Sequence, residues 1–291
     1  MPFYLAKLKK NRPCCALFVI FAHSKHNKIP IIMDTIIQAI EHGHISPRDI
    51  CFDRIRRQGY ADHGIRDQLN YGRNILSRQE QLAQYMFSYG LMVQNQWQVL
   101  ASLSEPVWQQ ADGRVRVFDY GCGQGLGSAL LLEHGLLAAC GERLDGIHLI
   151  EPSVLALARA EAVLSCYTDF TVPVALVNRR LDELQPQDLV CDPNGLNIHV
   201  FSNILDVQSF DLIALFNRII AQDGRHVFLA VSHERDFLGG DRLPGIYRAL
   251  CEVEEGADVW AVNHAQTGTF VCRRGQNAEY FVFDVNVGVK A

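Results

Sequence analysis

Residue types able to bind a nucleotide-sized ligand are concentrated in one short stretch of the chain. Asp119 ends an apolar run that begins at Val115, and glycines follow at alternate positions, Gly121, Gly123 and Gly125, before a helical pattern. Glycine lets the backbone turn sharply and leaves no side chain between the loop and a ligand lying across the strand ends. This order of strand, acid, glycine loop and helix predicts the floor of a binding pocket.

The glycine spacing separates two kinds of nucleotide loop. A dinucleotide-binding loop requires the pattern G-x-G-x-x-G. Counted from Gly121, the sixth position is Leu126, and counted from Gly123 it is Ser128, so the third glycine is missing in both registers. The spacing therefore argues against a nicotinamide dinucleotide as the ligand.

The same residues in the order acid-x-G-x-G-x-G resemble the first motif of class I S-adenosylmethionine-dependent methyltransferases, and residues 119–125 match every specified position. This resemblance implies that S-adenosyl-L-methionine is the cofactor and that Asp119 lies in the wall around its amino-acid end. The charge agrees, since a carboxylate complements the sulfonium and ammonium groups of that molecule. The loop residues expected beneath the cofactor are Gly121, Cys122, Gly123 and Gly125.

A second acid follows the next predicted strand, 146–151. In a doubly wound sheet the end of this strand lies beside the glycine loop, where an acid can accept both ribose hydroxyls of an adenosine. The resemblance assigns this role to Glu151, with Pro152 beside it. The 30 residues between Gly121 and Glu151 exceed the usual separation of about 20, which we attribute to a loop at 138–145. The alternative is an exposed glutamate that caps the following helix.

Two further strand ends supply candidates. After the third strand, Asp182 occupies the place where this family often contacts the adenine amino group, although Glu183 or an ordinary surface turn fits as well. Polar residues end the apolar run of the fourth strand, and we expect Ser202 and Asn203 at the floor of the reaction site. Methyltransferases directed at nucleic-acid amino groups have Asn/Asp-Pro-Pro-aromatic here, whereas this chain has Ser-Asn-Ile-Leu, with Ser202 its first residue.

The candidate catalytic residues are His233 and Asn203. His233 follows the fifth predicted strand and could act as a general base, because the ordinary pKa of histidine, near 6.5, lets it accept a proton at neutral pH. Glu234 could orient its ring. The alternative is a charged loop rim without a catalytic role. No metal site is expected, because the nine cysteines show neither a CxxC pair nor zinc-ligand spacing.

Hydrophobic periodicity predicts the elements that position these residues. Short apolar runs alternate with helical patterns after Pro106, which implies a parallel sheet with helices on both faces. Strands are expected at 115–119, 146–151, 173–178, 197–202, 226–232, 258–263, 267–273 and 279–287, and helices at 125–135, 153–165 and 207–221. With the family resemblance, this gives an α/β fold: Rossmann-like, doubly wound, with a mostly parallel seven-stranded sheet, an antiparallel C-terminal hairpin and an N-terminal helical cap.

Three segments are expected along the chain. Residues 1–32 are a leader or an extra strand, because basic residues precede a ten-residue apolar run there. Residues 33–105 form the helical cap, whose clearest helix spans 77–103 and ends near Pro106. Aromatic residues on that helix could shape the acceptor pocket. Residues 106–291 form the cofactor-binding domain.

Composition and charge limit the possible partners. The chain is 48% hydrophobic and 20% charged, typical of a globular protein, and no apolar run reaches the roughly 18 to 20 residues that span a bilayer, so stable membrane insertion is not expected. Residues 1–80 hold 13 Lys and Arg against 7 Asp and Glu, and the remainder 14 against 25. The basic N-terminal third would suit an anionic substrate or the acidic remainder of the chain.

These observations favour a cytoplasmic methyltransferase that transfers a methyl group by in-line displacement to an acceptor the sequence does not identify. Unpatterned cysteines are typical of a reducing compartment. A small molecule or a protein side chain is favoured as acceptor over nucleic acid, since no segment resembles an RNA-reading module and the net charge is −5. The alternative is a catalytically silent module with the same fold that serves as a binding or scaffold subunit. The oligomeric state is not predicted.

Overall fold

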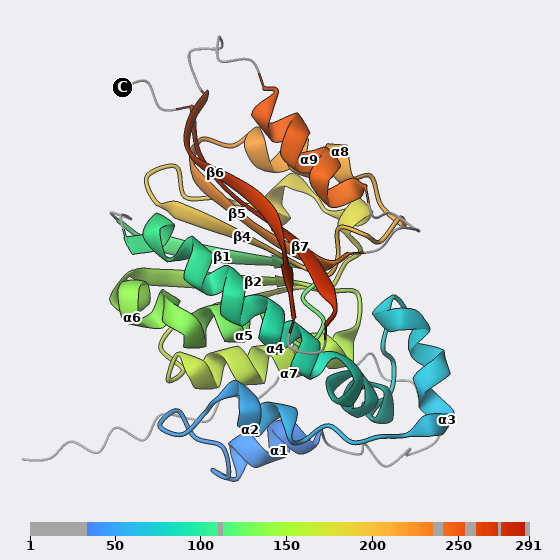
Figure 1. The fold of residues 1–291 in the computed structure, drawn as a ribbon. Coiled ribbons are helices and arrows are strands. Elements are labelled where there is room, and N and C mark those ends of the chain that lie inside the picture. Colours follow the sequence, from blue (N-terminus) through green and yellow to red (C-terminus); the bar gives the residue numbers. More distant parts are fainter. Residues whose placement is uncertain (1–33, 110–112, 235–240, 254–259, 273–274, 289–291) are drawn as a thin grey trace, which may run out of the picture. The chain divides into compact units, whose positions relative to one another are not determined.

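The central feature of the computed structural model is one mixed β-sheet (Figure 1). The structure describes residues 34–109, 113–234, 241–253, 260–272 and 275–288, which belong to a unit spanning 33–291. The expectation of a leader or extra strand at 1–32 lies outside the described residues.

The sheet has seven strands in the order β3-β2-β1-β4-β5-β7-β6. β1 to β5 pair in parallel, β7 pairs antiparallel to β5, and β6 pairs antiparallel to β7. The strands are β1 Val115–Tyr120, β2 Leu144–Ile150, β3 Val174–Val177, β4 Leu196–Ser202, β5 Gly224–His233, β6 Trp260–Val271 and β7 Asn277–Val287. This confirms the Rossmann-like, doubly wound fold with its C-terminal antiparallel hairpin.

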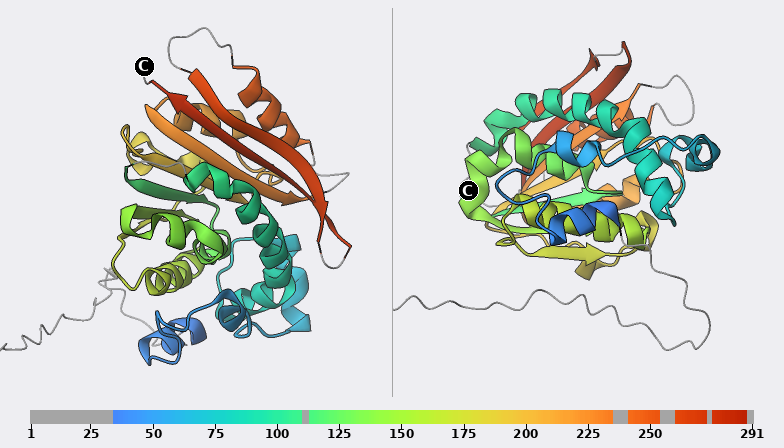
Figure 2. Two further views of the ribbon diagram at one scale, coloured as in Figure 1. Left: turned by 60° about the vertical axis from the view of Figure 1, so that its left-hand side comes forward. Right: turned by 90° about the horizontal axis from the view of Figure 1, so that it is seen from below.

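Helices cover both faces of the sheet (Figures 1 and 2). One face packs against α4, α5, α6 and α7, and the other against α8 and α9. A further layer of α1 and α2 lies against α4, α5 and α7 on the side away from the sheet. The helices are α1 Thr35–Glu41, α2 Phe52–Arg56, α3 His63–Arg66, α4 Gln79–Gln109, α5 Leu126–Leu131, α6 Leu137–Cys140, α7 Val154–Tyr167, α8 Leu212–Ile220 and α9 Arg242–Cys251.

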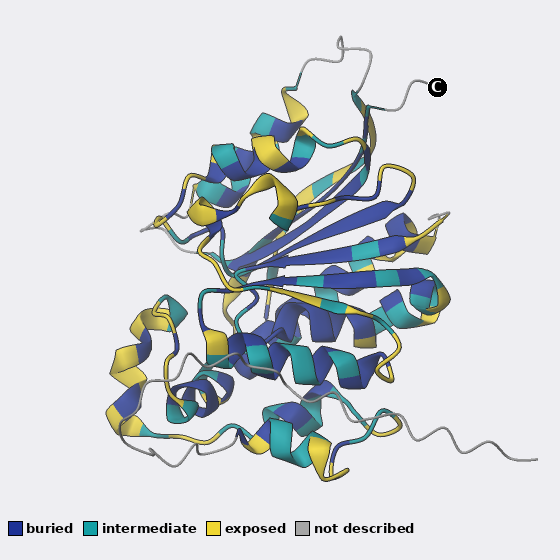
Figure 3. Cartoon of the chain, turned by 180° about the vertical axis from the view of Figure 1, so that it is seen from behind, coloured by how far each residue is buried: buried dark blue, intermediate teal, exposed yellow. Residues whose placement is uncertain are grey.

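The strand sequences explain why both faces are buried. Successive side chains of a strand point to opposite faces, and parallel sheets are covered on both sides. In β1, Val115 and Val117 belong to the largely aliphatic core beneath α4 and α5, whereas Phe118 and Tyr120 belong to an aromatic core beneath α8. Figure 3 shows the central strands in the dark blue of buried residues. Asp119 therefore points to the face of the sheet that α4 and α5 cover.

Four expected elements differ from the observed ones. The segment 138–145, expected as a loop, contains the end of α6, a short 3-10 helix at Gly141–Arg143 and the start of β2 at Leu144. The long helix α4 does not end near Pro106 but continues to Gln109, with the proline inside it. The strands expected at 258–263 and 267–273 form the single strand β6. The helix expected from residue 207 begins at Leu212, capped by the side chain of Asp211. In addition, α9 was not expected, because its apolar residues follow a polar and glycine-rich segment.

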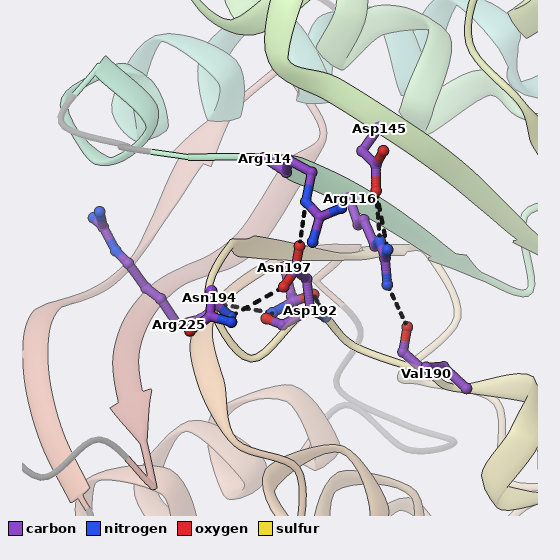
Figure 4. Close-up of polar contacts among 8 residues, drawn as sticks. All are labelled: Arg114, Arg116, Asp145, Val190, Asp192, Asn194, Asn197 and Arg225. Atoms are coloured by element: carbon purple, nitrogen blue, oxygen red, sulfur yellow. Dashed lines mark hydrogen bonds and ion pairs between the residues drawn. The ribbon is translucent and has the colours of Figure 1, made fainter.

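Polar contacts stabilise the edge of the sheet where β1 and β4 begin (Figure 4). Arg116 donates from Nε and Nη2 to Oδ2 of Asp145, at 3.1 and 2.9 Å. Arg114 forms an ion pair of 2.9 Å with the buried Asp192, whose backbone also bonds both ways with the amide of Asn197. These contacts fix the amino ends of the strands. The glycine loop and the acids that follow the strands lie at the other ends, the carboxyl ends.

A buried ion pair joins the start of the cap to the sheet domain. Asp34 caps α1 by accepting from two backbone N–H groups, and its other oxygen accepts from Nε of Arg159 on α7 at 2.7 Å and from Nη2 of the same residue. Both side chains are 2% exposed. Arg159 also donates to the side chain of Gln124 in the glycine loop. The cap and the loop therefore share one buried arginine.

Replacing Asp34 by Asn is expected to destabilise the fold by about 3 to 5 kcal/mol, because it leaves the buried Arg159 charge without its counter-ion. Denaturant unfolding measures the change. Asp49→Asn is the control, since Asp49 and its partner Arg54 are largely exposed and their ion pair contributes little. Equal destabilisation in the two variants would contradict the assigned role of the buried pair.

Candidate functional site

The glycine loop after β1 adopts left-handed backbone conformations at all three glycines. The φ angles of Gly121, Gly123 and Gly125 are 62°, 52° and 72°. A Cβ atom at Gly121 would lie 2.7 Å from the side chain of Ile204, and one at Gly125 would lie 3.0 Å from Ala160. At Gly123 a Cβ would meet nothing within 4 Å. Two of the glycines are therefore required by packing, whereas the third borders open space.

The predicted second acid bonds directly to this loop. Glu151 accepts from the backbone N–H of Gly123 through Oε2 at 3.0 Å and from that of Ser153 through Oε1 at 2.8 Å. It is 8% exposed, and burial raises the pKa of its carboxyl group, while the two backbone hydrogen bonds lower it. The alternative of an exposed capping glutamate is wrong, since Ser153 rather than Glu151 caps α7. Each oxygen keeps a lone pair for a ligand hydroxyl.

The first acid lies behind the loop rather than in its open face. Asp119 is 1% exposed and accepts from the hydroxyl of Ser128 through Oδ2 at 2.7 Å, while Oδ1 is buried and has no hydrogen-bond partner among the described residues. The pKa of Asp119 is raised to about 7, mainly by burial. The Ser128 hydrogen bonds lower the pKa and the nearby Glu151 raises it, and the value of about 7 includes both effects. A cation reaching this carboxylate would stabilise its charged form.

A pocket of about 130 Å³ lies at these strand ends. Seven of the ten expected cofactor-binding residues line it: Gly121, Gly123, Glu151, Pro152, Asp182, Ser202 and Asn203. The other three, Asp119, Cys122 and Gly125, do not line it. Cys122 bonds through its backbone N–H to Ile150, and Gly125 packs against α7, so these two shape the loop from behind.

Helix α4 fixes the two polar residues at the end of β4. The indole Nε1 of Trp97 donates to Oγ of Ser202 at 2.9 Å. Asn203 exchanges two amide hydrogen bonds with Gln96, at 2.8 and 3.1 Å, and has a left-handed φ of 55°. Non-glycine residues in this conformation concentrate at binding and catalytic sites. The side chains remain able to bond once more, since each amide atom of Asn203 has a second donor or acceptor position.

A larger cavity of about 1100 Å³ adjoins the first pocket. Four residues line both: Gly72, Arg73, Tyr85 and Asn203. The larger cavity follows one face of α4 and is also lined by His233 and Glu234. A ligand in the small pocket and a second molecule in the large cavity would therefore meet beside these four residues.

Of the candidate catalytic residues, His233 has a defined ring orientation. Its Nδ1 lies 2.7 Å from the backbone carbonyl oxygen of Asn277 on β7, so Nδ1 carries the proton and donates it. Nε2 is left as a proton acceptor in the neutral ring. The expectation that Glu234 orients the ring is replaced by this contact, in which the carbonyl of the neighbouring strand does so.

Sequence reasoning missed the contribution of the segment before α4. Residues Gly72 to Leu76 line the small pocket, and Asn70 and Tyr71 are in left-handed conformations with φ of 44° and 56°. No glycine motif or metal-ligand spacing marks this segment, whose only sequence signal is Gly72 beside polar residues. Asp206, which follows β4, forms an ion pair of 3.7 Å with Arg73 of this segment.

A separate histidine cluster lies within the aromatic core. Atoms of Cys191, His199 and His226 that could ligate a metal lie within 4.8 Å of one another, all buried. The hydroxyl of Tyr120 lies 3.0 Å from Nδ1 of His199, Nε2 of His199 lies 3.0 Å from Nδ1 of His226, and Nε2 of His226 lies 3.0 Å from the carbonyl oxygen of Gln222. One direction of donation satisfies every group in this chain, with both rings neutral. Burial lowers the pKa of His226 to about 4, which agrees.

No protein-family model matches the sequence, and the search of curated proteins finds no relative. Among solved structures, the chain is similar to a putative class I S-adenosylmethionine-dependent methyltransferase from Listeria monocytogenes (14% identity, TM-score 0.45, covering 86% of this chain and 73% of that one). It is also similar to the magnesium protoporphyrin IX methyltransferase from Synechocystis PCC 6803 with bound SAM (12% identity, TM-score 0.43, covering 81% of this chain and 97% of that one). A third similar structure is that of a putative RNA methyltransferase from Pyrococcus horikoshii (14% identity, TM-score 0.40, covering 66% of this chain and 84% of that one). The fold assignment rests on the strand order of this chain.

Within the residues that the structure describes, none of the helices is both long and apolar enough to cross a membrane.

The pKa of Asp119 gives a testable pH dependence. Its value rises from 3.8 to about 7 in the folded protein, so the folded state binds this proton more tightly than the unfolded chain does. The ligand-free protein should lose stability as pH rises from about 4 to about 7. Asp119→Asn resembles the protonated form, and we expect it to be more stable than the wild type at pH 8 but not at pH 4, by thermal unfolding. A difference that is independent of pH would contradict the assignment.

Proposed function

We propose that the protein is a class I S-adenosylmethionine-dependent methyltransferase, with a helical cap over residues 33–105 and a cofactor-binding domain over 106–291. The observation that supports this most directly is the left-handed Gly123, whose missing side chain leaves open space and whose N–H is held by Glu151. The left-handed φ favours glycine in any tight turn, so the support comes from the combination: the open space beyond Gly123 borders the small pocket, and a carboxylate is held beside it. A carboxylate held beside it is suited to ribose hydroxyls.

The residues that line the small pocket fit the hydrogen-bonding groups of S-adenosyl-L-methionine. Glu151 would accept the ribose hydroxyls, Asp182 lies in the same pocket for the adenine, and Pro152 lies beside both. Asp119 lies behind the loop and does not line the pocket, and its buried Oδ1, without a partner among the described residues, would act on the positive charge of the cofactor through the loop. When bound, the cofactor supplies an electrophilic methyl group on a positively charged sulfur.

Catalysis by this chain would consist mainly of positioning. Asn203, which lines both cavities, and Ser202, which lines the small pocket, are fixed by Gln96 and Trp97 and would align the acceptor with the methyl group. An acceptor that carries a proton must lose it as the new bond forms. His233 lines the acceptor side, and Nε2 of its neutral ring could take that proton.

The thiols agree with a reducing compartment, which we propose to be the cytoplasm. All seven cysteines among the described residues are free, and five of them are buried. Buried free cysteines behave as small apolar residues and need no oxidising environment.

Titration with S-adenosylhomocysteine tests the donor site. We expect binding of S-adenosylhomocysteine and none of NAD, and we expect Gly123→Val to abolish it, because the valine side chain fills the open space. Gly43→Val is the matched control: Gly43 also has a left-handed φ, 71°, and open space around its Cβ, but lies outside both cavities. Both variants lose similar stability from backbone strain. Heat evolved with NAD alone, or unchanged affinity in Gly123→Val, would exclude the proposal.

Methyl transfer is tested with tritium-labelled S-adenosylmethionine and fractionated cell extract. His233→Asn is expected to lower the transfer rate by about 10²-fold or more if the acceptor needs deprotonation, with unchanged affinity for S-adenosylhomocysteine. His264→Asn, on the edge strand β6, is the control. Donor binding without labelling of any fraction would favour the catalytically silent binding module instead.

A further inference from the structure

The larger cavity has a charge opposite to that of the protein as a whole. Among the described residues, four arginines line it against the two carboxylates Asp206 and Glu234, whereas the chain has a net charge of −5. The arginines are Arg56, Arg57, Arg66 and Arg73. All four come from the basic N-terminal third of the sequence, so the folded protein gathers part of that charge around one cavity.

Arg73 has donor groups that the protein does not satisfy. Its Nε and Nη2 are buried and have no hydrogen-bond partner among the described residues, and the nearest carboxylate oxygen, on Asp206, is 3.7 Å from Nη2, too far for a hydrogen bond. Buried donors without partners destabilise a folded protein, because they lose the hydrogen bonds that water gives them in the unfolded chain. Such a group in a folded protein calls for an explanation, and a ligand is one of the usual ones.

Two other arginines in this chain bind a carboxylate through the same pair of nitrogens, Nε and Nη2, that lack hydrogen-bond partners in Arg73. Arg225 uses Nε and Nη2 to hold the two oxygens of Asp284, at 3.0 and 2.7 Å, and Arg116 uses the same pair on Asp145. These two nitrogens form the side of the guanidinium that matches the two oxygens of a carboxylate or phosphate. In Arg73 this side makes no hydrogen bond with the described residues, and its Nη2 reaches Asp206 only as an ion pair of 3.7 Å.

Arg56 lies along the same cavity with a similar deficit. Its Nη2 reaches Asp53 at 3.2 Å, but its Nε is buried and has no partner among the described residues. Its side chain packs against α4, since a Cβ at Gly90 would lie 3.1 Å from Cγ of Arg56. The two arginines therefore approach the cavity from the cap, on the side of α4.

The remaining wall offers flat apolar surface. Tyr85 and Tyr89 on α4 have ring centroids 4.9 Å apart, and both line the cavity. Phe87 and Tyr71 are 57% and 76% exposed and line it as well. Aromatic side chains exposed to this extent in one cavity are typical of a binding site for a ring or another flat apolar group.

The position of Arg73 connects this surface to the donor. Arg73, Tyr85 and Asn203 line both cavities, and the larger one extends along α4 as far as Asn95, about 15 Å beyond Tyr85 at 1.5 Å per residue. A small molecule bound there would have one end beside the donor pocket and its body along the aromatic wall.

We propose that the methyl acceptor is a small anionic molecule with a flat apolar body, whose oxyanion is bound by Arg73 and Arg56. This inference rests on the proposed function, because it assigns the substrate class of the same site. It explains the unsatisfied guanidinium groups, the excess of arginine and the exposed aromatic rings together. A nucleic acid or a protein segment as acceptor becomes an outcome of the test.

The test uses two probes of the same shape, 2-naphthoate and its neutral amide 2-naphthamide, titrated into the full chain loaded with S-adenosylhomocysteine. We expect the naphthoate to bind about tenfold or more tightly than the amide, since hydrogen bonds to a charged group contribute more than those to a neutral one. Arg73→Gln should reduce this ratio to about one and leave the affinity for the amide unchanged. Arg73→Lys should keep only part of it, because lysine lacks the paired donors.

Arg48→Gln is the matched control: it removes the same charge from an exposed residue outside both cavities, and we expect the wild-type ratio. Thermal unfolding of each ligand-free variant identifies any that fails to fold, and Arg56→Gln then provides a second variant with the same expectation. A wild-type ratio near one would overturn the proposal. So would weaker binding of both probes alike in Arg73→Gln.

Three other outcomes are distinguishable. If Arg73→Gln weakens S-adenosylhomocysteine and keeps the naphthoate selectivity, Arg73 binds the donor and the proposal is wrong. Competition identifies a macromolecular acceptor. If a short single-stranded RNA or an acidic peptide displaces bound naphthoate at a lower concentration than 2-naphthamide needs to displace it, the proposal is also wrong. If the wild type does not bind S-adenosylhomocysteine, the proposed function fails, and the naphthoate ratio of the ligand-free protein still decides whether the cavity selects anions.

Discussion

The hydrogen bond between the carboxylate of Glu151 and the N–H of Gly123 is the contact on which the site depends. It joins the ends of the neighbouring strands β1 and β2, and it requires both a left-handed residue at 123 and an acid at 151. Burial opposes the charge of Glu151, and the backbone N–H groups offset part of that cost. The protein's own contacts therefore shape the pocket, at the edge of the sheet where the strands end.

The helical cap is part of this arrangement rather than an addition to it. Arg159 bonds to Asp34 at the start of α1 and to the side chain of Gln124 in the loop, and Gln124 in turn donates to the backbone carbonyl of Leu82 on α4. Disturbing the cap would thus disturb the loop. The same helix α4 fixes Ser202 through Trp97, so one helix contacts both the donor pocket and the acceptor cavity.

The cores on the two faces of the sheet differ in composition and in what they hold in place. The aliphatic core beneath α4 and α5 holds the cap against the strands, while the aromatic core beneath α8 holds His199 and His226 in a neutral chain of hydrogen bonds. That chain satisfies polar groups that would otherwise be buried without partners, and it requires no ionised group. His233, the residue proposed for proton transfer, lies at the cavity rather than in the core.

The sequence by itself determined the alternation of strands and helices, the glycine loop and the acid at 151, because these follow from local patterns: alternating elements, glycine spacing and an acid at a strand end. It did not determine the course of α4 through Pro106, the merging of two expected strands into β6, or the place of Arg73. Packing decides these, since a long helix buried against a sheet tolerates one proline. Charges distant along the chain meet only when the cap folds onto the sheet.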